Sequence, residues 1–356
     1  MMDKNSPKIG LVSLGCPKAL VDSEVLINKL QTLGYGISQT YDNADAVVVN
    51  TCGFLDSAKT ESLNAIGEAL NENGKVIVTG LSRLYSRIYT GFSSKCDGHK
   101  WPQKFNESGL IREHSIKSNP FEAKPSSSYV KLTPRHYSYL KISEGCNHKC
   151  SFCIIPSLRG PLKSRSMASI LSEARSLVKR GTKELLIISQ DTSAYGLDLK
   201  FEETLVNGKK LKTNIYNLVN ELASLGIWVR LHYIYPYPHV KQLIPLMDQN
   251  RVLPYLDVPF QHAHPDVLKR MARPSNNVHD LEQISEWRSI NSDLSIRSTF
   301  IVGFPGETES EFNFLLDWLE EAKIDRVGCF KYEDVSGARS KQMEGHLHKD
   351  IIQDRY

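Results

Sequence analysis

The motif Glu144-Gly-Cys-Asn-His-Lys-Cys-Ser-Phe-Cys153 is the most informative segment of this sequence. Its cysteines, Cys146, Cys150 and Cys153, have a C-x3-C-x2-C spacing and directly follow an apolar run that is predicted to be a strand. Three thiolates on one tight loop can hold three irons of a 4Fe-4S cluster and leave the fourth iron open to a ligand. Zinc is the alternative, but structural zinc takes four protein ligands, and this stretch lacks paired C-x2-C halves. We therefore predict an iron–sulfur site and interpret His148 as a solvated loop residue.

Downstream of this loop, strand and helix signals alternate. The candidate strands are residues 139–142, 184–189, 228–233, 255–260, 296–302 and 326–332. One helical stripe between them consists of Phe312, Leu315, Leu316 and Leu319. Thr308 and Glu311 predict a capping box before that helix. Six strands with right-handed helical crossovers favour a partial (β/α)6 barrel over residues 129–336, with its chemistry at the carboxyl ends of the strands. Residues 337–356 are interpreted as a truncated tail.

Upstream, residues 8–80 alternate in the same way, and we assign residues 1–80 to an N-terminal domain. Apolar or β-branched runs at residues 9–12, 46–49 and 76–78 enclose two helical segments, which gives a βαβαβ order. This order indicates an α/β domain with a doubly wound, flavodoxin-like parallel sheet. Cys16 follows the first strand and Cys52 follows the second, so we expect both at the sheet edge where such folds bind ligands.

The composition is that of a globular protein with two or three domains. The chain has 356 residues, of which 40% are hydrophobic and 24% charged, and no apolar run approaches the ~20 residues of a membrane helix. The first residues lack the apolar core of a secretory signal. Seven cysteines are too few for a disulfide scaffold, so we expect reduced thiols that bind metal or take part in chemistry.

Residues 81–128 match no structural pattern. From residue 81 to residue 137 the chain has ten Ser, and ten Lys or Arg against four Asp or Glu. A stretch of this length without a period is typical of a linker rather than of a domain interior. Its positive charge would also suit contact with nucleic acid or a ribosome, although we favour the interpretation as a solvated linker.

These motifs together resemble a known family. A C-x3-C-x2-C motif with an aromatic residue before the last cysteine, here Phe152, is the signature of radical S-adenosylmethionine enzymes. The surrounding YLKISEGCNHKCSFCIIPSLRG (139–160), with LGCPKALVDSE (14–24) and NTCGFLDSAK (50–59), is similar to the methylthiotransferases among them. Within that group the sequence resembles the type that modifies an aspartate of ribosomal protein S-twelve, over residues 8–80 and 130–336.

The resemblance implies a chemistry and a set of site residues. In the family, the open iron binds the amino and carboxylate groups of S-adenosylmethionine, and reductive cleavage yields a 5′-deoxyadenosyl radical. The β-carbon of aspartate has no proton acidic enough for acid–base catalysis, so a cofactor has to carry the hydrogen abstraction. The implied catalytic and iron-binding residues are Cys146, Cys150 and Cys153. The implied cofactor-binding residues are Phe152, Ser189, Gln190, Asp191, Arg230, Gln261, Gly303 and Glu307.

The chain departs from the family at two places. In the family, three N-terminal cysteines hold a second 4Fe-4S cluster, whereas here Cys16 and Cys52 supply two and Leu81 stands where the third is expected. Cys96 is the nearest other thiol, and it lies in the segment 81–128, which is either a degraded or frameshifted stretch or an insertion. The small all-β TRAM domain that ends family members is also not expected before Tyr356.

We therefore expect a cytoplasmic radical S-adenosylmethionine methylthiotransferase. Its family cofactors are two 4Fe-4S clusters, the N-terminal one incomplete here, and S-adenosylmethionine. Its expected partners are ribosomal protein S-twelve or the small ribosomal subunit and an electron donor such as flavodoxin or ferredoxin, with no membrane. We expect sulfur insertion to be impaired. The alternatives are a tRNA adenosine methylthiotransferase, and a non-catalytic remnant that binds S-adenosylmethionine or the ribosome.

Overall fold

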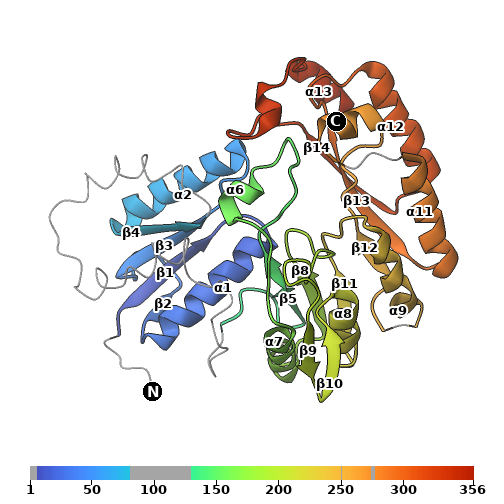
Figure 1. Ribbon diagram of the computed structural model, residues 1–356. Helices are drawn as coiled ribbons and strands as arrows, with labels where there is room; N and C mark the ends of the chain where they lie inside the picture. Colours follow the sequence, from blue (N-terminus) through green and yellow to red (C-terminus); the bar gives the residue numbers. More distant parts are fainter. Residues whose placement is uncertain (1–5, 81–129, 250, 274–276) are drawn as a thin grey trace. The chain divides into compact units, whose positions relative to one another are not determined.

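The computed structural model describes residues 6–80, 130–249, 251–273 and 277–356. The chain divides into two compact units, Met1–Thr133 and Pro134–Tyr356, and each is described by itself (Figure 1). The segment predicted to be irregular, 81–128, lies outside the described residues together with Leu81 and Cys96.

The first unit contains a four-stranded parallel sheet in the order β2-β1-β3-β4. Its strands are β1 (Lys8–Ser13), β2 (Gly36–Ser38), β3 (Ala46–Thr51) and β4 (Val76–Gly80). Its helices are α1 (Pro17–Thr32) and α2 (Asp56–Asn73). The predicted parallel-sheet architecture is confirmed, with β2 as an additional short edge strand that carries no apolar run.

The two helices cover opposite faces of this sheet. On β3, Val47 and Val49 pack with Ile66 of α2, while Val48 packs with Leu30 of α1. All six residues of β3 are buried because both of its faces are covered, which explains its continuous apolar run. The sheet is therefore doubly wound, as the sequence predicts.

The second unit is built on six parallel strands, in the order β14-β13-β12-β11-β8-β5. These strands are β5 (Tyr137–Lys141), β8 (Glu184–Ile188), β11 (Trp228–Leu231), β12 (Tyr255–Asp257), β13 (Ser295–Val302) and β14 (Arg326–Lys331). The α-helices among them are α7 (Met167–Lys179), α8 (Ile215–Ala223), α9 (Ile244–Asp248), α10 (Pro265–Arg270), α11 (Asn277–Ile290) and α12 (Glu309–Ala322). The strands are arranged in sequence order from β5 to β14, which is the predicted partial barrel (Figure 1).

Helix α12 shows which side chains face the core of this unit. The capping box of Thr308 and Glu311 is present as predicted. The buried residues are Glu311, Leu315, Trp318 and Ala322. The predicted stripe is wrong at Leu316, which is 44% exposed. Leu316 lies about 100° around the helix from Leu315, and Trp318 takes its place against Phe260 and Phe300.

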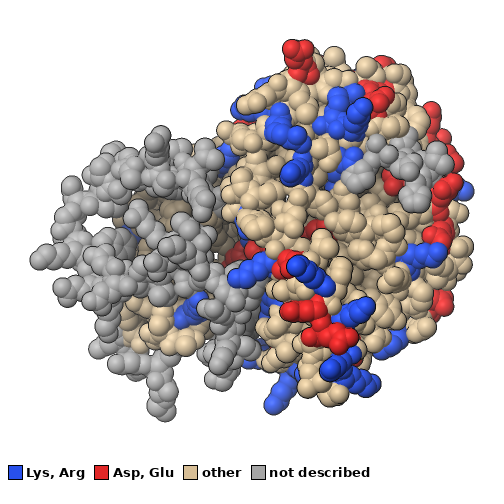
Figure 2. All heavy atoms as spheres, in the orientation of Figure 1, with Lys and Arg blue, Asp and Glu red and all other residues tan. Residues whose placement is uncertain are grey.

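Smaller elements surround the barrel strands. They are β6 (Ser143–Glu144), α6 (Ile155–Arg159), β7 (Lys163–Ser164), β9 (Glu203–Val206), β10 (Lys209–Lys212), η1 (Pro238–Leu243), η2 (Arg339–Gln342) and α13 (Lys349–Arg355). Strands β9 and β10 form an antiparallel hairpin that the sequence interpretation missed. Figure 2 shows positive and negative side chains mixed over the visible face of this unit.

Candidate functional site

The three predicted cysteines lie on one loop, between β6 and α6. Their thiols are free and partly buried. The backbone N–H of His148 donates to Cys146 Sγ (3.4 Å), and that of Ile155 donates to Cys153 Sγ (3.4 Å). Such N–H groups favour thiolates, whereas burial raises the pKa of Cys146 and raises that of Cys153 to about 12. A bound cation would offset the cost of ionising these thiols, so the donor set fits the three protein ligands of an open 4Fe-4S cluster.

A cavity of about 220 Å³ opens beside Cys146. It is lined by Cys146, Asn147, His148, Leu162, Asp191, Ala194, Leu197 and Tyr237. Most of these residues follow the carboxyl ends of β5, β8 and β11, where barrels of this kind place their chemistry.

One wall of the cavity is a hydrogen-bonded group of His148, Asp191 and Tyr237. His148 Nε2 lies 2.7 Å from Asp191 Oδ2, and the Tyr237 hydroxyl donates to the same oxygen (3.1 Å). The His148 ring stacks on Tyr235, with a centroid distance of 4.1 Å. His148 is therefore an ordered part of the site, and its interpretation as a solvated loop residue is wrong. Asp191 holds the middle of the cysteine loop against the loop after β8.

Glu144 lies at the start of the cysteine loop and binds three side chains. It accepts hydrogen bonds from Lys141 (2.7 Å), Arg159 (2.9 Å) and Gln190 (2.7 Å). Burial would raise the pKa of Glu144, but Lys141 and Arg159 outweigh burial and lower it to about 2. The sequence interpretation missed Glu144, although a carboxylate two residues before the first cysteine was a signal available in the motif.

Gln190 offers a hydrogen-bond acceptor without a partner. Its Nε2 donates to Glu144, while its Oε1 is buried and has no hydrogen bond within the described residues. A buried acceptor without a donor is costly, and a ligand amino group would satisfy it. This orphan atom fits the predicted cofactor role of Gln190.

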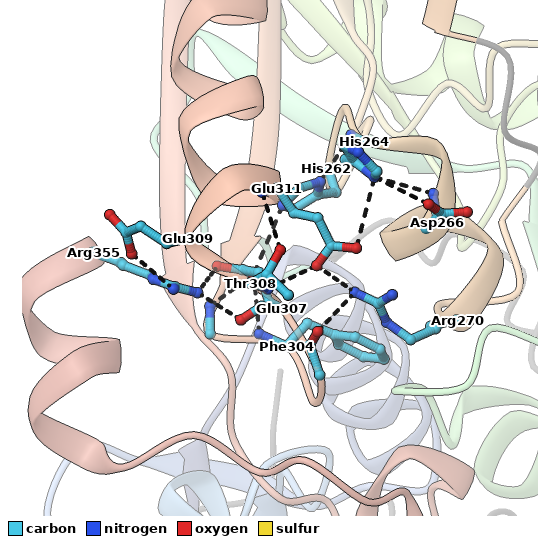
Figure 3. Close-up of polar contacts among 12 residues, drawn as sticks. His262, His264, Asp266, Arg270, Phe304, Glu307, Thr308, Glu309, Glu311 and Arg355 are labelled. Carbon is cyan, nitrogen blue, oxygen red and sulfur yellow. Dashed lines mark hydrogen bonds and ion pairs between the residues drawn. The ribbon is translucent and has the colours of Figure 1, made fainter.

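The loop after β13 carries Gly303 and Glu307. Glu307 Oε2 accepts the backbone N–H groups of Gly303 (3.0 Å) and Phe304 (3.2 Å), which closes the loop on itself (Figure 3). Phe304 is fully buried in an apolar cluster with Val267, Met271 and Tyr332, and Phe152 packs against that cluster. The apolar cluster thus connects the β13 loop with the cysteine loop.

Three other predicted cofactor residues, Ser189, Gln261 and Arg230, form hydrogen bonds within the protein. Ser189 is buried, with its hydroxyl 3.2 Å from that of Thr192. Gln261 exchanges backbone hydrogen bonds with β13 at a positive φ of 74°. Arg230 binds Glu184 (2.6 Å), at the first residue of β8, which is the opposite end of the strand from the cysteine loop. The structure therefore does not bring Arg230 to the cavity.

A group with metal-ligand chemistry lies near α12 as well. The ligand atoms of His264, Asp266 and Glu311 are within 4.8 Å of one another. Glu311 Oε2, however, is bound by Arg270 (2.8 Å) and by the backbone N–H of Thr308 (2.7 Å) (Figure 3). A cation would compete with Arg270 there. Glu311 belongs to the capping box of α12, and His264 caps α10 by accepting the backbone N–H of Asp266 (3.2 Å).

In the first unit, Cys16 and Cys52 occupy neighbouring loops after β1 and β3. A Cβ on Gly15 would lie 3.2 Å from Cys52 Sγ, so the two cysteine-bearing loops approach closely. The described residues provide two thiols at this edge. An iron–sulfur cluster takes four ligands, and the described thiols do not fit a three-cysteine set.

Both units contain regions that match known protein families. Residues 140–319 match the Radical SAM superfamily, and residues 8–83 match the uncharacterized protein family UPF0004. The chain is 58% identical over 353 residues to ribosomal protein uS12 methylthiotransferase RimO of Roseobacter denitrificans, covering 98% of this chain and 76% of that protein. It is 53% identical to the RimO of Bordetella petrii, covering 100% of this chain and 82% of that protein.

The chain belongs to the RimO family of radical S-adenosylmethionine methylthiotransferases. The relatives do not favour the tRNA-modifying alternative. Among solved structures, the fold is similar to that of the radical S-adenosylmethionine methyltransferase TsrM of Kitasatospora setae, with a TM-score of 0.60 at 13% identity, over 92% of this chain and 75% of that one. None of the helices in the described residues is long and apolar enough to cross a membrane.

Proposed function

We propose that this protein attaches a methylthio group to the β-carbon of an aspartate in ribosomal protein S-twelve. The observation that carries the proposal is the three-thiol loop at the carboxyl end of the first barrel strand, next to a cavity and an orphan acceptor. The names of the relatives support the substrate. Since that substrate is ribosomal, we place the protein in the cytoplasm, with the small ribosomal subunit as partner and a flavodoxin or ferredoxin as electron donor.

Cys146, Cys150 and Cys153 would hold the 4Fe-4S cluster. With S-adenosylmethionine, the bound cluster supplies a radical able to abstract hydrogen from an unactivated carbon. The residues of the chain would bind S-adenosylmethionine and orient it. Gln190 Oε1 would accept a hydrogen bond from the amino end of the cofactor, and the β13 loop that Glu307 closes would contact the cofactor.

The surroundings of the thiols keep the loop in one position and exclude water. Phe152 packs into the apolar cluster of Phe304, which shields one side of the cysteine loop. Asp191 and Glu144 hold the other side through His148 and Arg159. A rigid, partly dry site is required because a radical reacts with whatever it can reach.

Sulfur insertion requires more than the barrel. In the family that the sequence resembles, sulfur insertion depends on the N-terminal cluster. For that cluster the described residues supply two cysteines, Cys16 and Cys52. We therefore propose that the chain cleaves S-adenosylmethionine while transferring the methylthio group poorly.

The test is anaerobic reconstitution with iron and sulfide, followed by reduction in the presence of S-adenosylmethionine. We expect 5′-deoxyadenosine from the wild-type chain and none from Cys150→Ala. Cys329→Ala, which removes a thiol on β14, is the matched control and should retain formation. Undiminished 5′-deoxyadenosine from Cys150→Ala would contradict the assignment of the site.

A further inference from the structure

The last helix of the second unit lies directly on the loop after β13. Ile352 of α13 packs so closely on Gly303 that a Cβ there would lie 2.6 Å from Ile352 Cγ1. The backbone N–H of Gly306 donates to the carbonyl of Gly345 (2.7 Å). Residues 337–356, interpreted from the sequence as a tail, are thus packed against the loop that carries Gly303 and Glu307.

Arg355 makes the central contact. Its Nη1 donates to Glu307 Oε1 (2.7 Å) and to the Glu307 carbonyl (3.0 Å), and its Nη2 donates to Glu309 (3.0 Å) (Figure 3). The Arg355 side chain is 6% exposed and that of Glu307 is 0% exposed. Two short hydrogen bonds to one residue define the direction as well as the distance of the contact.

Within the described residues, Arg355 is the cation that neutralises Glu307. His262 Nε2 faces Glu307 Oε2 at 3.7 Å, but burial lowers the pKa of His262 to about 3, so the imidazole is neutral at physiological pH. Without Arg355, a fully buried carboxylate would have two backbone N–H groups and a neutral ring as partners. A buried charge without a counter-charge moves or takes up a proton.

The same C-terminal segment also holds the cysteine loop. The backbone N–H of Ser340 in η2 donates to the Ser151 carbonyl (2.9 Å), and Arg339 Nη2 donates to the Lys149 carbonyl (2.7 Å). The accepting residues flank Cys150. Both loops of the candidate radical site are therefore fixed by residues 339–355.

We propose that Arg355 is a positioning residue for S-adenosylmethionine binding, acting through Glu307 on the backbone of Gly303 and Phe304. Arg355 neutralises Glu307, Glu307 orders the two N–H groups, and the ordered loop presents its edge to the cofactor. This inference rests on the proposed function in one respect, that the β13 loop meets S-adenosylmethionine.

The test compares Arg355→Gln with Lys349→Gln, which removes the same charge from an exposed position of the same helix. In the reconstituted protein we expect Arg355→Gln to raise the dissociation constant for S-adenosylmethionine about tenfold, or ~1.4 kcal/mol, at unchanged iron content. The change that the cofactor induces in the electron paramagnetic resonance spectrum of the reduced cluster should need correspondingly more cofactor. Arg355→Lys should recover part of the affinity.

Hydrogen exchange gives a readout without cofactor or turnover. Amides of residues 299–308 should exchange faster in Arg355→Gln than in Lys349→Gln. In Glu307→Gln, adding Arg355→Gln should change the affinity little further, because both act through one contact.

Two results would overturn the inference. One is a wild-type affinity for S-adenosylmethionine in Arg355→Gln, whether or not its thermal stability falls. The other is additive loss in the double variant. If the wild-type chain itself binds no S-adenosylmethionine after reconstitution, the proposed function fails, and the exchange comparison still decides whether Arg355 orders the loop.

Discussion

Replacing Glu144 by Gln should destabilise the second unit strongly. The substitution keeps the shape of the side chain but removes the negative charge that Lys141 and Arg159 both face. The side chains of Lys141, Glu144 and Arg159 are 2%, 11% and 9% exposed, so water cannot replace the lost carboxylate. Breaking an ion pair at this depth costs about 3–5 kcal/mol, and we expect a loss of that size in the free energy of unfolding.

The assay is urea denaturation of the purified chain at pH 7, followed by circular dichroism. Glu286→Gln is the matched control, because it removes the partner of Lys241 in a pair whose side chains are 52% and 45% exposed. That control should cost under about 1 kcal/mol. A loss in Glu144→Gln no larger than that in Glu286→Gln would refute the argument that the buried charges around Glu144 stabilise this end of the barrel.

Three further predictions follow from described residues. Burial lowers the pKa of His262 from 6.5 to about 3, so between these pH values the unfolded chain binds a proton that the folded chain does not. As the pH is lowered from 6.5 towards 3, the free energy of unfolding should therefore decrease by about 1.4 kcal/mol per pH unit. In urea titrations at several pH values, His262→Gln should show a weaker dependence of this free energy on pH. Iron analysis after anaerobic reconstitution should find about four irons per chain, and about eight would show that Cys16 and Cys52 suffice for a second cluster. In a strain without its own enzyme, mass spectrometry of ribosomal protein S-twelve should show little methylthio shift, and a complete shift would contradict the proposed impairment.

Most of the fold could be predicted from sequence because apolar strand runs alternate with helical stripes along the chain. A continuous apolar run such as β3 has few other interpretations once helices flank it. The hairpin of β9 and β10 escaped because its strands are polar and show no apolar alternation. The sequence nevertheless contained a signal for its turn, the pair Asn207-Gly208. In the structure both residues adopt positive φ, as a two-residue hairpin turn requires.

In the candidate site, the local part could be predicted from the sequence and the long-range contacts could not. The cysteine loop is local in sequence, so spacing alone predicts that its thiols come together. The contacts that hold the loop are not local. Arg355 reaches Glu307 across 48 positions and Arg339 reaches Lys149 across 190, and no periodicity encodes such pairs. Arg230 illustrates the converse, because a charge in an apolar strand signals a partner without saying that the partner is Glu184.

The sequential order of the barrel strands has a consequence for synthesis on the ribosome. From β5 to β14, each strand pairs with the one made just before it, so every new strand finds its template already formed. The cysteine loop belongs to the first of these strands, yet two of its carbonyls receive their hydrogen bonds from η2, which is made after the last. The loop is thus exposed to the solvent early and completed late. Loading of iron is therefore expected to follow translation of residues 339–355 rather than to accompany the emergence of the thiols.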